Sequence, residues 1–225
     1  MENHFWLGSL CANRGKTGLP AGVVSVSDTI TIEKDLGNRI PNKSWMLYLL
    51  EAFDRTRGTP VELNLICQFD ESDNFWAIFG GVNRYKFTDV LPVVSHSYTR
   101  QINFRKQARE IEYEVIDKTS GNREKFVFAA SGIAFEARNQ FTGLEWWNKT
   151  GHEPFPVRYG AFVSELEWAH ADGPGTTRVP YDSLVPDKDS SAGSYPVTFR
   201  IRSGEGQLSY AVCDGRTSSG IAVQA

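Results

Sequence analysis

The sequence has few of the residues that build disulfide frameworks and metal centres. Its 225 residues include three cysteines, Cys11, Cys67 and Cys213, and four histidines. The cysteines are odd in number and form no C-x-x-C pair, so they predict neither a disulfide framework nor a zinc site. The histidines lack the spacing of a ligand set, and no metal is expected. This cysteine usage favours a cytoplasmic protein with reduced thiols.

Long apolar runs and an excess of basic charge are also missing. The longest apolar candidate, residues 45–50, is far shorter than the roughly 18 to 20 residues of a membrane span. Residues 1–6 have neither the basic nor the apolar region of a secretory signal, which again favours an intracellular chain. Lysine and arginine total 24 against 27 acidic residues, a net charge of -3. We therefore expect no membrane and no nucleic-acid partner.

Sequence motifs of common cofactors and nucleophiles are absent as well. The chain has no G-x-S-x-G pentapeptide for a hydrolase serine. It has no G-x-G-x-x-G turn for a dinucleotide and no G-x-x-x-x-G-K loop for a nucleotide phosphate. No cofactor is expected.

What the sequence does have is a hydrophobic period of two. Valine and isoleucine alternate with serine and threonine over residues 23–33, and residues 61–69 repeat the pattern. Residues 110–116 alternate with glutamate and lead through a turn at 117–122 into 126–128, which predicts a hairpin. Further strands are expected at 144–147, 162–168, 197–201 and 208–212. Only residues 44–53 have the length of a helix, and their apolar run fits a buried strand equally well.

Many short strands with almost no helix predict an all-β fold. We expect a two-sheet antiparallel β-sandwich or jelly roll, forming a single domain over residues 1–225. Residues 171–194 are rich in turn-forming residues and predict a long surface excursion. A loosely held C-terminal tail is expected from about residue 213. A second copy that covers the strand edges would make a homodimer, which no specific motif supports.

Candidate functional groups are carboxamides and carboxylates set among aromatic residues. Gln68 shares the polar side of its strand with Glu62 and Asn64, and Glu145 lies an even number of residues from Lys149, hence on the same side of an extended strand. Outward-facing sheet residues with no function would have the same pattern. One sheet face cannot bury both members of the pair Trp146-Trp147, so one of them must point away from the core.

Several sequence blocks follow one another in a distinctive order: Phe5-Trp6-Leu7-Gly8, the strand at 23–33, Ser44-Trp45-Met46, Leu65-Ile66-Cys67-Gln68, Phe75-Trp76, the hairpin from Tyr113, and Leu144-Glu145-Trp146-Trp147 with Pro154-Phe155 and Phe162 after it. Their order resembles that of the eqolisins, the glutamic peptidases. The resemblance implies a concanavalin-like jelly roll, a two-sheet β-sandwich with a concave catalytic face. It also implies that Gln68 occupies the position of the catalytic glutamine.

The position that the resemblance implies for the catalytic glutamate is Lys149. A lysine ammonium cannot accept a proton from water unless its pKa is strongly lowered. Glu145 lies about 13 Å away along an extended strand. The resemblance therefore implies a diverged site that is no longer proteolytic.

Three functional hypotheses remain open at this stage. The first is an apolar or aromatic small molecule bound in the concave cleft, with Gln68, Lys149 and Glu145 as catalytic candidates and Trp45, Trp76 and Trp147 as ligand-binding residues. If the protein is an enzyme, we expect a cofactor-independent cyclase or cycloaddition catalyst of secondary metabolism, because such reactions need orientation and exclusion of water more than a nucleophile. The second is an acid peptidase that uses Gln68 and Glu145. The third is a carbohydrate-binding, lectin-like module.

Overall fold

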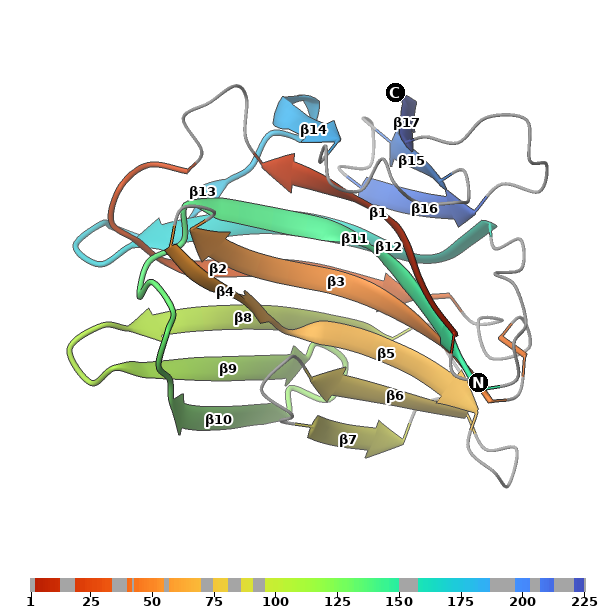
Figure 1. Ribbon diagram of the computed structural model, residues 1–225, viewed down its shortest axis with the longest axis horizontal. Helices are drawn as coiled ribbons and strands as arrows, with labels where there is room; N and C mark the ends of the chain where they lie inside the picture. The colour runs from red at the N-terminus through yellow and green to blue at the C-terminus, as the bar shows by residue number, and fades with distance from the viewer. Residues whose placement is uncertain are drawn as a thin grey trace.

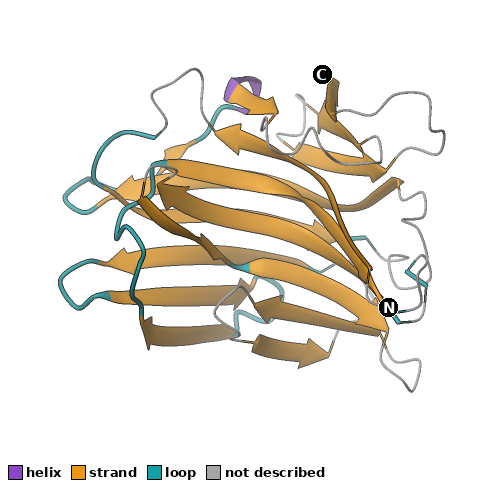
Figure 2. Cartoon of the chain, viewed as in Figure 1, coloured by secondary structure: helices purple, strands orange, loops and turns teal. Residues whose placement is uncertain are grey.

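The computed structural model describes residues 3–12, 19–33, 40–41, 43–54, 57–69, 75–80, 86–90, 96–149, 158–186, 197–202, 207–212 and 221–224. Most of this part of the chain is β-strand, as Figure 2 shows. The ambiguous apolar segment at 44–53 is strand β3 (Ser44–Asp54). The predicted strand at 61–69 is divided at Leu63 between β4 and β5, while its alternation is as expected.

The strands follow one another along the chain with few helical interruptions. They are β1 (Asn3–Ala12), β2 (Val23–Ile32), β3, β4 (Arg57–Glu62), β5 (Asn64–Phe69), β6 (Phe75–Gly80), β7 (Lys86–Val90), β8 (Ser97–Arg105), β9 (Glu110–Asp117), β10 (Arg123–Ala129), β11 (Asn139–Asn148), β12 (Arg158–His170), β13 (Thr177–Arg178), the 3-10 turn η2 (Tyr181–Ser183), β14 (Leu184–Pro186), β15 (Val197–Arg202), β16 (Gln207–Val212) and β17 (Ile221–Gln224).

Within the described residues the strands form two sheets. The first has the order β14-β1-β11-β3-β5-β6-β7, with β4 paired to β3. The second has the order β10-β9-β8-β2-β12-β16-β15-β17, with β13 paired to β12. Strand pairs are antiparallel apart from β15 and β17, which run parallel. Figure 1 shows the sheets as two layers, with β11 and β3 drawn over β12 and β2. The predicted two-sheet β-sandwich is confirmed.

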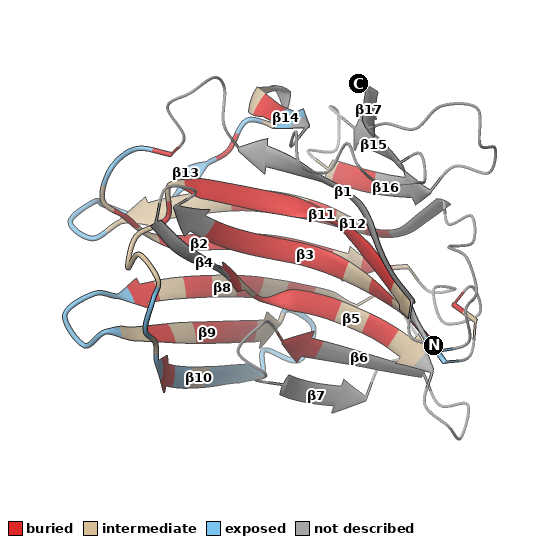
Figure 3. Cartoon of the chain, in the orientation of Figure 1, coloured by how far each residue is buried: buried red, intermediate tan, exposed pale blue. Residues whose placement is uncertain are grey.

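The core lies between the sheets and is made by alternate residues of each strand. Met46 and Tyr48 of β3 point inward and are buried, as do Ile102 of β8 and Tyr113 of β9 from the opposite sheet. Red buried positions accordingly run along β11, β3, β5 and β8 in Figure 3. Trp146 belongs to this core with no exposed surface, so the strand alternation predicted for the Trp146-Trp147 pair is correct.

A buried ion pair in the second sheet also contacts the first sheet through its arginine. Arg100 of β8 donates from Nε and Nη2 to the two carboxylate oxygens of its register partner Asp28, at 2.8 and 2.6 Å. Its Nη1 donates across the core to the carbonyl oxygens of Tyr48 and Leu63, at 2.7 and 3.2 Å. Both charged side chains are completely buried, so each depends on the other for its solvation. The same guanidinium therefore holds the second sheet to the backbone of the first.

Gln140 of β11 makes a second link at an irregularity of β12. The register between β12 and β2 shifts between Ser164 and Glu167, and Glu165 has a φ of 51°. A bulge of this kind leaves backbone carbonyls without ladder partners. The buried Gln140 side chain donates to the carbonyl oxygens of Ser27 and Glu167, at 3.1 and 3.3 Å.

The remaining fold predictions concern connections. The hairpin is confirmed: β9 pairs with β10, and Gly121 in the turn has a φ of 75°. The excursion from residue 171 contains β13, η2 and β14, and residues 187–194 lie outside the described part. Of the predicted tail, residues 221–224 form β17, and residues 213–220 lie outside it. The single domain and loosely held tail stay predictions. Across the described ranges, no helix is long and apolar enough to span a membrane.

Candidate functional site

The outer face of the first sheet, which we call the tryptophan face, points away from the second sheet. Its residues are those that alternate with the core positions Met46 and Tyr48, beginning on β3 with Trp45 and Leu47. Both outward side chains are half-buried. Residues directly opposite each other in an antiparallel pair lie on one face, so the strand register determines which residues are neighbours here.

One register row crosses this face and contains most of the residues predicted for the site. Trp147 of β11 is opposite Trp45 of β3, which is opposite Gln68 of β5, which is opposite Trp76 of β6. We call these four positions the aromatic row. The side chains of Trp147, Trp45 and Gln68 are half-buried, whereas that of Trp76 lies outside the described part, so Trp76 is placed by its backbone alone. Three strands thus bring two indoles and a carboxamide together.

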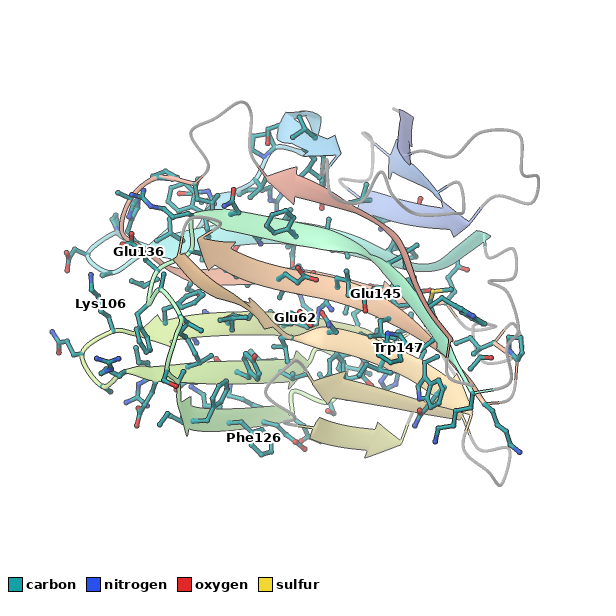
Figure 4. The ribbon with its side chains drawn as sticks, viewed as in Figure 1. Glu62, Lys106, Phe126, Glu136, Glu145 and Trp147 are labelled. Carbon is teal, nitrogen blue, oxygen red and sulfur yellow. The ribbon has the colours of Figure 1, made fainter. Side chains whose placement is uncertain are left out.

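Glu145 lies one step along β11 from the row, on the same face. Its register partner on β3 is Leu47, and on β1 it is Trp6. The side chain is 9% exposed, and Trp147 Nε1 donates a hydrogen bond to Glu145 Oε2 at 3.4 Å. Figure 4 shows Glu145 and Trp147 close together on β11. An indole N–H has only this one proton to donate, so the contact fixes the orientation of the Trp147 ring relative to the carboxylate.

Lys149 follows the last residue of β11 and reaches the same row. Its backbone N–H donates to the carbonyl oxygen of Lys43 at 3.1 Å, which ties the end of β11 to the start of β3. Its side chain is exposed, and Nζ lies 5.5 Å from the centroid of the Trp45 ring. The structure therefore brings Gln68, Glu145, Lys149, Trp45 and Trp147 to one face.

Exposure decreases along the tryptophan face from the aromatic row toward the other end of β3. Trp45 and Leu47 are half-buried, but Leu49 is completely buried and Glu51 is only 4% exposed. Phe141 of β11, opposite Glu51, is 1% exposed. The accessible part of this face is therefore the end that carries the aromatic row, and a molecule from solvent meets the tryptophans first.

A pair of glutamates at the buried end did not emerge from the sequence. Glu51 of β3 is directly opposite Glu62 of β4, and Asn64 Nδ2 donates to Glu62 Oε2 at 3.0 Å. Asn64 Oδ1 also accepts from the backbone N–H of Leu50, at 3.2 Å, where β4 gives way to β5. The period of two placed Glu62 beside Asn64 but said nothing of Glu51, because their proximity depends on the β3–β4 register.

The groups on this face support binding better than nucleophilic chemistry. Cys67, next to Gln68 in sequence, points into the core, and burial raises the pKa of its thiol, so it does not supply a thiolate. No group of three histidine, cysteine or acidic side chains in the described ranges is placed to hold a metal ion. The absence of a cofactor stays a prediction. The available groups are indole rings, a carboxamide, a carboxylate and an ammonium.

Comparison with solved structures identifies the fold. Scytalido-glutamic peptidase with a peptide-based transition-state analogue superposes with a TM-score of 0.55 at 6% identity, covering 92% of this chain and 97% of that one. The same peptidase with a transition-state analogue inhibitor gives 0.54 at 8% identity. SCP-B, a member of the eqolisin family in complex with the tripeptide Ala-Ile-His, gives 0.51 at 8% identity. The predicted resemblance is confirmed at the level of the fold: this chain is a diverged eqolisin-like β-sandwich.

Comparisons of sequence add nothing to this assignment. No family model matches the chain. No curated protein matches it either. At identities of 6 to 8% the structural likeness concerns the fold alone, so the chemistry of the site has to be argued from its own residues.

Proposed function

We propose that the tryptophan face binds an apolar or aromatic small molecule across the aromatic row. The observation that carries this proposal is the row itself, in which Trp147, Trp45 and Gln68 are neighbours on adjacent strands and half-buried. The apolar area that a large side chain outside the core exposes to water is unfavourable in free energy. A guest that covers both indoles removes this area from water.

The dimensions of the row suit a flat guest. Neighbouring strands lie about 4.8 Å apart, so Trp147 and Gln68 are separated by roughly 10 Å across β3. That span is about the length of two or three fused rings, and a carboxamide at one end offers both a donor and an acceptor to a polar substituent. The aromatic rings contribute contact area, and Gln68 contributes orientation.

Cyclisation of the bound molecule is the reaction that we propose for this site. A cyclase needs its substrate folded and kept dry more than it needs a nucleophile. In this proposal Gln68 donates to a carbonyl group of a guest that lies on Trp45, Lys149 contributes its positive charge from the edge of that ring, and Glu145 is the proton acceptor on the same face. Localisation in the cytoplasm and an origin in secondary metabolism remain part of this hypothesis.

The binding proposal is tested with N-phenyl-1-naphthylamine, an uncharged aromatic probe whose fluorescence rises in an apolar site. We expect saturable binding, with an affinity about tenfold lower in Trp45→Leu, because the ring at the centre of the row is lost. The control is Val127→Thr on β10, which removes a side chain that is 44% exposed on the other sheet. Binding that is unchanged in Trp45→Leu, or equally reduced in Val127→Thr, overturns the proposal.

Acid peptidase activity is the alternative that the fold itself favours. Gln68 and Glu145 share the tryptophan face, but they lie on β5 and β11 with β3 between them. Two strand spacings and a two-residue offset separate their Cα atoms by roughly 12 Å. Incubation with a denatured protein from strongly acid to neutral pH tests this function. Cleavage that disappears in both Gln68→Ala and Glu145→Gln would establish the peptidase and displace the cyclase.

A further inference from the structure

The ammonium of Lys149 lies on the ring face of Trp45 in the middle of the proposed binding row. The distance from Nζ to the ring centroid is 5.5 Å, within the range of a cation–π contact. The side chain is exposed, so its ammonium has water available as an alternative. The indole of Trp45 is thus oriented to receive a positive charge from the solvent side.

The backbone of Lys149 is held by a hydrogen bond, while its side chain is exposed and contacts the Trp45 ring. The N–H of Lys149 donates to Lys43 at the start of β3, where Lys43 has a φ of 62°. This hydrogen bond places the root of the side chain beside Trp45. The four-carbon stem is flexible, and a cation–π contact at an exposed site is weak, so an incoming ligand can displace the ammonium.

The described side chains deeper on this face are rich in carboxylates. Glu145 is 9% exposed, Glu51 is 4% exposed, and Glu62 is half-buried opposite Glu51. The basic residues placed on the face are Lys149 at its open end and, by backbone register, His4 of β1 opposite Trp147 and Lys86 of β7 opposite Gly80. Glu145, one register step from the row, is the carboxylate close enough to favour a cation there, because Glu51 and Glu62 lie six residues, roughly 20 Å, farther along β3.

We propose that the small molecule carries an organic cation, a quaternary or protonated amine, which replaces the ammonium of Lys149 on Trp45. This inference rests on the proposed function and specifies its ligand class. The indole of Trp45 takes the charge on its face, Trp147 contributes apolar contact beside it, and Glu145 lies one register step away with its own hydrogen bond from Trp147. Lys149 is then a tethered competitor at the entrance to the site.

Choline and its uncharged carbon isostere 3,3-dimethylbutan-1-ol test this idea, because they differ in charge and hardly in shape. Binding is followed by tryptophan fluorescence. We expect the protein to bind choline more tightly than the isostere. Lys149→Met removes the competing ammonium and keeps an unbranched apolar stem, so choline affinity should rise about two- to fivefold while isostere affinity changes less than about twofold.

The matched control is Lys106→Met, which removes the same charge from an exposed turn and should leave both affinities unchanged. Figure 4 places Lys106 far from Trp147. Lys149→Gln serves as a second neutral variant if Lys149→Met fails to fold. In either background, Trp45→Leu should abolish the preference for choline.

Equal affinity for choline and the isostere, or weaker choline binding in both Lys149 variants, overturns the cation inference. If N-phenyl-1-naphthylamine still binds in a Trp45-dependent manner, the proposed function stands and only the ligand class is wrong. If the unsubstituted protein binds none of the three probes, both the proposed function and the cation inference are wrong.

Discussion

The two outer faces of this sandwich occupy equivalent positions and differ in the side chains of their central strands. The outer face of the second sheet, which we call the polar face, is a ladder of cross-strand hydrogen bonds. Thr29 contacts Thr99 at 3.2 Å, and Thr31 contacts Ser97 at 2.7 Å. Farther along, Gln101 Nε2 donates to Ser25 Oγ at 2.9 Å. The outer face of the first sheet instead carries Trp45, Leu47 and Trp147.

This difference shows which side chains a β-sandwich requires and which it does not. A β-sandwich requires apolar residues on its inner faces, and the polar face shows that an outer face of this chain is stable with serine, threonine and charged side chains. Two glutamates of that face have polar partners: Glu112 accepts from Asn103 at 3.1 Å, and Glu114 lies 2.9 Å from Arg123. A sandwich of this kind therefore does not require indoles on the tryptophan face, and ligand binding is the reason that we propose for their presence.

The largest expected effect comes from consecutive residues of β11 that point to opposite faces. Trp146→Ala leaves a cavity among completely buried side chains and should lower the free energy of unfolding by about 3 to 5 kcal/mol. Trp147→Ala removes a half-buried ring from the tryptophan face and should cost only about 1 to 2 kcal/mol. Urea unfolding measures both values.

Probe binding should show the reverse order. Trp147→Ala should weaken N-phenyl-1-naphthylamine binding, whereas Trp146→Ala should leave it nearly unchanged while the protein is folded. If the two variants lose equal stability, or if neither alters binding, the distinction between an inner structural face and an outer binding face is wrong.

A second large effect is expected at the buried pair of Arg100 and Asp28, which lies between the two sheets. Arg100→Met leaves the carboxylate of Asp28 buried without its partner and should destabilise the fold by about 3 to 5 kcal/mol. Combining it with Asp28→Leu removes the stranded charge, so the double variant should recover much of the loss. The control is Arg105→Met, whose 3.0 Å pair with Glu110 is 48% exposed on the arginine side, with an expected cost below about 1 kcal/mol. A small loss in Arg100→Met would show that the sheets do not depend on this pair.

Local sequence patterns were enough to predict which side of its strand a residue faces, but not which residues of other strands lie beside it. The period of two placed Gln68 with Glu62 and Asn64, and it required Trp146 and Trp147 to separate, as they do. Side-chain direction in a strand is a property of consecutive residues, so it can be predicted without the fold. The many short strands predicted the sandwich, and the family resemblance implied its concave face and the place of Gln68 on it.

Contacts across strands could not be obtained in this way. Arg100 and Asp28 are 72 residues apart, and nothing in either strand marks them as a pair. The opposition of Glu51 and Glu62 and the alignment of Trp147, Trp45 and Gln68 likewise depend on registers between strands. Register is determined by how all the hydrophobic faces fit together, so a single sequence without that fit leaves it open.

The smallest expected effect concerns a carboxylate of the polar face and depends on pH. Thr29 Oγ1 donates to Glu165 Oε2 at 2.7 Å, and Lys118 Nζ donates to the same oxygen at 3.0 Å. The hydrogen bond from Thr29 and then that from Lys118 hold the pKa of Glu165 below its ordinary value of 4.5. The folded protein thus keeps this group ionised to a lower pH than the unfolded chain does. Its contribution to stability is present above pH 4.5 and is lost as the pH falls through the lowered pKa.

Glu165→Gln should therefore lower stability at pH 7 by less than about 1 kcal/mol, because Glu165 and Lys118 are both well exposed. The difference from the unsubstituted protein should shrink toward zero as the pH falls below 4.5 and through the lowered pKa of Glu165, where this group becomes protonated in both states. Urea unfolding at several pH values measures this, with Glu124→Gln on β10 as a control that replaces another exposed carboxylate of the same sheet. A difference that is constant with pH would mean that Glu165 acts through packing at the β12 bulge and not through its charge. In that case hydrogen bonding of charged groups would not explain why the polar face is stable at this position, and the contrast with the tryptophan face would be weaker there.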